Sequence, residues 1–104
     1  MNTKNKVQLI GTVDTPTVNR LESDVLRATF KIKTPSTFIN NLGMKSKGEY
    51  KHFCIAYGKL AEIIDRYVTE GTEIAIEGIL IQDESTGQSQ VQVNDLLILS
   101  KKSN

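Results

Sequence analysis

The sequence predicts an all-β fold, a five-stranded barrel with one helix between the third and fourth strands. Alternating apolar and polar residues recur in short segments along the chain, which is typical of strands with one buried face. One segment, residues 59–68, has helical spacing instead. Turn-forming residues separate the segments. With 104 residues the chain suffices for one compact domain, so we expect residues 1–104 to form a single domain with a polar end over about 100–104.

The first two strands are predicted over residues 6–13 and 26–34. In the first, Val7 and Leu9 alternate with polar neighbours, and Gly11 indicates a bulge or a sharp bend. Residues 14–17 are predicted to form a turn. The second strand has the clearest alternation in the chain, with apolar residues on one face and basic residues on the other. Pro35 is expected to end it, because proline cannot donate a hydrogen bond to a ladder.

The rest of the chain supplies a long loop, three strands and the helix. Residues 36–48 are polar and are predicted to form the loop, and residues 50–57 are apolar and aromatic enough for the third strand. Gly58 separates that strand from the helix, and Gly71 is a plausible stop after it. The fourth and fifth strands are predicted over residues 73–81 and 91–99, with residues 82–90 as a hairpin connection.

This order of elements is that of an OB-fold, a partly open five-stranded Greek-key barrel. A generic small α+β domain would give a similar order of elements.

Composition excludes several classes of function. The lone Cys54 cannot form an internal disulfide, and a single His without clustered Cys or paired carboxylates provides no metal site of recognised spacing. No phosphate-binding glycine loop or nucleophile motif is present, so we expect neither an enzyme nor a cofactor. No stretch has the length of a membrane span or the pattern of a secretory signal, so we expect a cytoplasmic protein without membrane contact.

Three short motifs, in order and at compatible spacing, resemble the bacterial single-stranded-DNA-binding (SSB) proteins. The motifs are Lys6-Val7-Gln8-Leu9-Ile10-Gly11, Tyr57-Gly58-Lys59-Leu60-Ala61-Glu62 and Ile76-Glu77-Gly78. The resemblance spans nearly the whole chain. It implies an OB-fold that assembles as a homotetramer, or as a dimer, and wraps single-stranded DNA.

The resemblance also assigns roles to single residues. It places Tyr57 at the position of a stacking Phe and Phe38 near that of a stacking Trp, and it matches Lys6 and Lys59 to family lysines. His52 matches a histidine near a subunit interface of the family.

The chain departs from the family pattern in five respects. It has no Trp, Lys51 stands where a stacking Trp is usual, and Phe53 stands where an Arg is usual. The hairpin over residues 82–90 is short, and the long acidic-tipped tail is missing. Partner recruitment through such a tail is therefore doubtful for this chain.

Residues that could bind single-stranded DNA gather around the second and third strands. A binder without sequence preference needs aromatic rings for the bases and cations for the phosphates. The candidates are Lys6, Arg27, Lys31, Lys33, Phe38, Lys45, Lys47, Tyr50, Lys51 and Tyr57. A solvated strand face is the alternative for the lysines, and a local anchor into the core is the alternative for Phe38. For Phe53 we favour a place in the core or in a subunit interface.

Three functions follow from these observations. The first is binding of single-stranded DNA without sequence preference, in replication, recombination or repair. The second is a primosomal replication protein of the PriB type, which resembles a tail-less SSB and is dimeric. The third is an OB-fold whose ligand surface has become a protein-interaction surface. The formal net charge of only +1 and the missing Trp favour this third reading.

Overall fold

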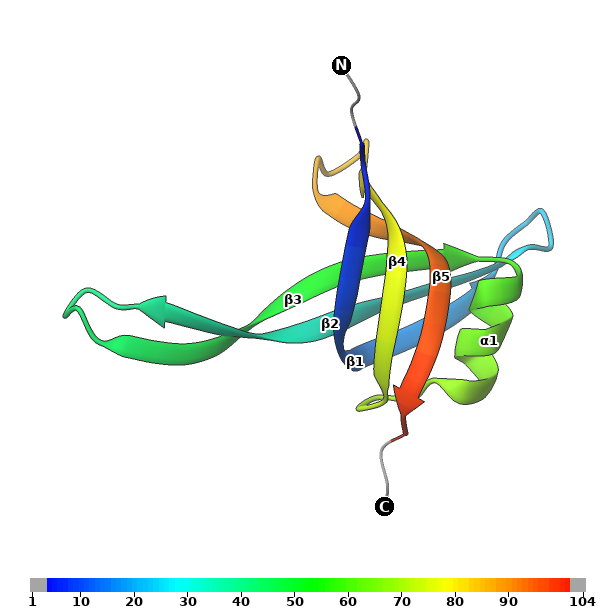
Figure 1. The fold of residues 1–104 in the computed structure, drawn as a ribbon. Helices are drawn as coiled ribbons and strands as arrows, with labels where there is room; N and C mark the ends of the chain where they lie inside the picture. Colours follow the sequence, from blue (N-terminus) through cyan, green and yellow to red (C-terminus); the bar gives the residue numbers. More distant parts are fainter. Residues whose placement is uncertain (1–3, 102–104) are drawn as a thin grey trace.

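A computed structural model describes residues 4–101 and shows a closed barrel with the strand order β1-β2-β3-β5-β4. The strands are β1 (Val7–Arg20), β2 (Leu26–Ile39), β3 (Lys45–Tyr57), β4 (Glu73–Gln82) and β5 (Ser89–Ser100), and α1 (Lys59–Tyr67) lies between β3 and β4 (Figure 1). Neighbouring strands are antiparallel except β3 and β5, which are parallel. The predicted fold class and order of elements are confirmed.

The barrel core consists of the inward-facing residues of every strand together with one face of α1. Val13, Ile32 and Ile74 are fully buried at its centre, and Ile64 of α1 joins them. The helix presents Ala61 and Ile64 to the strands because apolar residues recur along it at helical spacing. Within residues 4–101, no helix is long and apolar enough to cross a membrane.

The turn predicted over residues 14–17 is wrong, because β1 continues through it to Arg20. The pairing of β1 with β2 shifts register between Asp14 and Thr17, and Thr15 has a positive φ of 48°. These are the marks of a β-bulge, which bends a strand without ending it. The bend lets one long strand pair with β4 over its first half and with β2 over its second half.

The prediction of a strand end at Pro35 and of a loop over residues 36–48 is also wrong. The β2–β3 ladder runs from the pair Arg27–Tyr57 out to the pair Ile39–Lys45, and the resulting two-stranded ribbon projects from the barrel (Figure 1). The pairing of β2 with β1 reaches only to Lys33, so Pro35 lies where β2 has a partner on one side. A proline is tolerated there because its missing N–H can face the open edge.

Two glycines allow strands to approach closely. A Cβ on Gly11 would lie 2.2 Å from the carbonyl oxygen of Lys33, and a Cβ on Gly78 would lie 2.1 Å from that of Gln92. Neither space admits any larger residue. The predicted irregularity at Gly11 is therefore a close backbone contact inside the barrel.

Candidate nucleic-acid interface

The outward-facing side chains of β1, β2 and β3 form a continuous surface, which we call the cationic face. Residues paired across a ladder point to the same side of a sheet. The pairings therefore place Lys33 beside Lys51, Lys31 beside Phe53, and Arg27 beside Tyr57. Thr12, Asp14 and Asn19 of β1 complete these three rows. The predicted cations of β2 thus share one surface with Tyr57.

The projecting ribbon extends this face and separates the predicted residues into two sets. Lys45 and Lys47 pair with Ile39 and Thr37, so they alternate onto the same side as Lys33 and Lys51. Phe38 and Tyr50 occupy the intervening positions and lie on the opposite side of the ribbon. The basic and aromatic residues interleaved in this part of the sequence therefore occupy opposite sides of the ribbon. Lys45 and Lys47 lie on one side, and Phe38 and Tyr50 lie on the other.

Carboxylates are few on the cationic face. Asp14 Oδ2 lies 3.5 Å from Lys51 Nζ, and Glu49 is exposed on the ribbon. Partial burial alone would raise the pKa of Asp14, but the attraction and hydrogen bond of Lys51, with the charge of Lys33, hold that pKa below its usual value. Asp14 therefore stays ionised and neutralises part of the positive charge that Lys51 would offer to a phosphate.

Phe53 lies at the centre of the cationic face and is 46% exposed. The ammonium of Lys31 sits 5.1 Å from the centre of its ring, within the range of a cation–π contact. This position rules out the core, one of the two places that the sequence favoured for Phe53. The strand alternation that puts Phe53 in step with Lys51 and Tyr57 is the signal that could have identified it.

Tyr57 is 42% exposed at the end of β3, so its ring is accessible beside Arg27. The Nε atom of Arg27 is buried and has no hydrogen-bond partner within residues 4–101. Buried donors are normally paired in folded proteins. Beside Tyr57, Arg27 therefore carries a hydrogen-bond donor that none of the described residues uses.

Phe38 combines the two roles that the sequence left open. Its ring lies against Gly48, where an added Cβ would be 3.0 Å from the ring, so the ring anchors the ribbon locally. It is nevertheless 47% exposed and leaves a surface for a base. Tyr50, on the same side of the ribbon, is more exposed still, and its ring centre lies 6.4 Å from that of His52.

His52 and Lys6 lie apart from the cationic face. His52 faces the interior side of the ladder beside Ile32, and its Nε2 is 3.0 Å from the hydroxyl of Thr34. Lys6 stands before β1, where its Nζ is 2.8 Å from a Glu77 carboxylate oxygen. That hydrogen bond and charge keep the pKa of Glu77 below its usual value. The predicted roles of both residues stay predictions.

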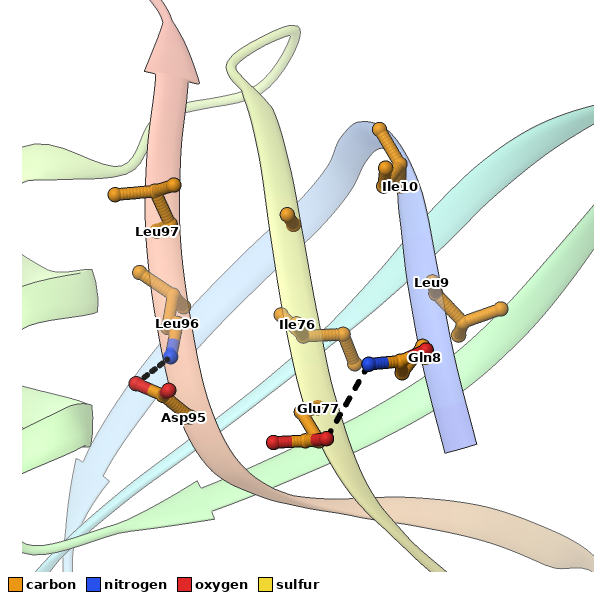
Figure 2. A pocket seen from close by; sticks show the side chains of 9 residues that line it. Gln8, Leu9, Ile10, Ile76, Glu77, Asp95, Leu96 and Leu97 are labelled. Carbon is orange, nitrogen blue, oxygen red and sulfur yellow. Dashed lines mark hydrogen bonds between the residues drawn. The ribbon is translucent and has the colours of Figure 1, made fainter. Parts of the chain in front are cut away.

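A second outer surface, formed by β1, β4 and β5, differs in chemistry. It has a hollow of about 310 Å³, shown in Figure 2, whose lining includes Ile10, Leu97, Glu77 and Asp95. Ile10 and Leu97 are more than 60% exposed. We call this the apolar sheet face. Its two carboxylates would repel phosphates, whereas its apolar side chains suit contact with another protein.

The described residues offer little for catalysis or metal binding. Burial raises the pKa of the Cys54 thiol to about 12, so the sulfur stays protonated near neutral pH and is a poor nucleophile and metal ligand. Between residues 4 and 101, no three His, Cys, Asp or Glu side chains are grouped so that they could hold a metal ion.

The sequence of this chain is similar to those of known single-stranded DNA-binding proteins. The chain is 31% identical to the single-stranded DNA-binding protein of Bacteroides thetaiotaomicron, over 94% of this chain and 67% of the relative. It is 25% identical to single-stranded DNA-binding protein 1 of Xylella fastidiosa, over 98% of this chain and 82% of that one.

Solved structures share the fold. The SSB of Plasmodium falciparum in complex with single-stranded DNA superposes with a TM-score of 0.77 at 24% identity, covering 96% of this chain and all of that one. PriB of Ralstonia solanacearum gives a TM-score of 0.72 at 16% identity, covering 92% and 98%. Residues 4–102 match the single-strand binding protein family, and the chain belongs to that family.

Proposed function

We propose that this protein binds single-stranded DNA without sequence preference, through the cationic face. The observation that carries the proposal is the register of β2 with β3. It puts Arg27 beside Tyr57 and Lys31 beside Phe53, two half-exposed rings, with the Lys33–Lys51 pair on the same face. Family membership supports the same function. Because the family consists of binding proteins, the proposal includes no enzymatic step.

Binding uses both charge and base stacking. Ammonium and guanidinium groups hold the phosphates, and the ring of Tyr57 stacks on a base at the cationic face. Phe38 offers a second stacking ring on the opposite side of the ribbon, to a strand that crosses from one side to the other. Every base has a flat face and every nucleotide a phosphate, so neither contact depends on sequence. A protein with these properties would protect or organise exposed strands during replication, recombination or repair, in the cytoplasm beside the nucleoid.

Fluorescence anisotropy with labelled poly-dT, at low and at moderate salt, tests the proposal. We expect tight binding at low salt that weakens with salt, because each phosphate neutralised on a single strand contributes a log–log slope of about −0.7. An unlabelled duplex of equal length is the control and should compete poorly, since its bases cannot stack on the rings. No binding at low salt would favour the protein-interaction reading.

We also propose that the apolar sheet face joins copies of this chain into a homo-oligomer. Its exposed Ile10 and Leu97 offer apolar area to a second copy, and its carboxylates make DNA an unsuitable partner. A tetramer is the favoured assembly and a dimer the alternative. The variant Leu97→Glu should lower the mass measured by light scattering, whereas Leu42→Glu, a change at the exposed ribbon tip, should not. Two subunits in the wild type would favour the primosomal reading.

A further inference from the structure

The cationic face contains a hollow of about 250 Å³ between the bulge of β1 and Phe53. Phe30, Cys54 and Ile55, all buried, contribute to its lining. The remaining lining residues are Thr15, Thr17, Thr29, Lys31, Phe53 and Gln90. The hollow therefore combines an apolar surface with hydroxyls, one amide, one cation and one ring, and no carboxylate lines it.

We propose that this hollow receives one unpaired nucleobase, which stacks on Phe53. The inference rests on the proposed function and adds a binding subsite to it. The ring is half exposed and is covered by the ammonium of Lys31, which is itself on a flexible side chain. A base stack is stronger than a cation–π contact at an exposed site, so an entering base displaces Lys31. The freed ammonium then lies next to the phosphate of the same nucleotide.

The polar lining suits the edge of a base. Threonine hydroxyls and the Gln90 amide both donate and accept hydrogen bonds, so the edges of different bases can be satisfied. The surrounding cations Lys31, Lys33 and Arg27 favour a polyanion over a second copy of this chain. The hollow on the apolar sheet face lacks these properties, because Glu77 and Asp95 line it.

A tryptophan placed in the hollow would report stacking directly. The chain has no Trp, so Phe53→Trp introduces its only indole. Tyr67→Trp is a matched control, because Tyr67 is 48% exposed on α1 and carries Lys101 at 5.4 Å from its ring centre. Addition of poly-dT should quench the indole fluorescence of F53W and leave that of Y67W unchanged. Binding seen by anisotropy without quenching in F53W would overturn the inference.

Affinity measurements separate stacking from charge. Phe53→Leu keeps an apolar side chain without a ring and should weaken poly-dT binding about 5- to 150-fold, whereas Tyr67→Leu should not. An abasic strand of equal length has the phosphates but no bases, so F53L should bind it as the wild type does.

The outcomes distinguish the two proposals. If F53L binds poly-dT as tightly as the wild type, or if its subunit number changes, the base subsite is refuted but the proposed function is not. A wild type that binds no poly-dT refutes the proposed function itself.

Discussion

The lysines of the projecting ribbon provide the sharpest test of the cationic face. Lys45 and Lys47 are exposed, lie on the same side as Lys33 and form no ion pair with any residue of 4–101. The double change Lys45→Gln and Lys47→Gln removes two charges without touching the core. We expect it to weaken DNA binding mainly at low salt, since each lysine that contacts a phosphate displaces counterions.

The expected salt dependence of DNA affinity follows from the number of cations on that face that form no ion pair with a described carboxylate. Arg27, Lys31, Lys33, Lys45 and Lys47 give a slope of about −3.5 if each neutralises one phosphate, so affinity falls about 100-fold from 50 to 200 mM salt. The double variant retains three of these cations. Its slope should be about −2, and its DNA affinity should fall about 20-fold over the same range of salt concentration.

Anisotropy titrations with labelled poly-dT at four or five salt concentrations measure both slopes. The matched control is Lys59→Gln with Lys101→Gln, which removes the same charge from the helix side of the barrel, where Lys101 covers Tyr67. Its slope should equal that of the wild type. Equal slopes for the ribbon variant and the wild type, or an equal reduction in both variants, would refute the assignment of the cationic face.

Three further predictions concern single residues. Asp14→Asn should raise DNA affinity at low salt and steepen the salt slope by about 0.7, because Lys51 loses its carboxylate partner; an unchanged slope in the same titration would count against this role. Gly78→Ala should lower the free energy of unfolding in urea by at least about 1–3 kcal/mol, because the added methyl meets the Gln92 carbonyl, and an unshifted midpoint would contradict that contact. The Cys54 thiol, with its pKa raised to about 12 by burial, should resist thiol reagents at pH 8 until the protein is unfolded; rapid labelling of the native protein would show the barrel to be open there.

The periodic pattern of apolar residues predicted those elements correctly that bury one face along their whole length. The strand containing Ala28, Phe30 and Ile32 and the helix containing Ile64 were both predicted from the period of their apolar residues, since burial of one face imposes that period. The failures occur where β1 passes residues 14–17 and where β2 passes Pro35. Turn-forming residues normally end strands, but ladder pairing with a neighbouring strand carried the chain through both.

The candidate site was likewise predicted only in part. The sequence predicted the cations and Tyr57 as DNA ligands, because a non-specific binder needs those residue types, and the structure brings those of β2 and β3 onto one face. It gave no means of separating Phe38 from the lysines around it, because a residue predicted in a loop has no defined face. The sequence favours the core or an interface for Phe53 because apolar rings are usually covered, whereas its position in β3, in step with Lys51 and Tyr57, leaves the ring half exposed.

By itself the sequence determined the element order, the apolar faces of the elements and the chemistry available for a ligand, since each depends on residue type and local period. The tertiary structure alone decided which side chains share a surface. That outcome depends on the register of β2 against β1 and β3, and a shift of one residue would exchange the two faces of the strand. Register arises from the packing of the whole barrel, so no local stretch of sequence contains it.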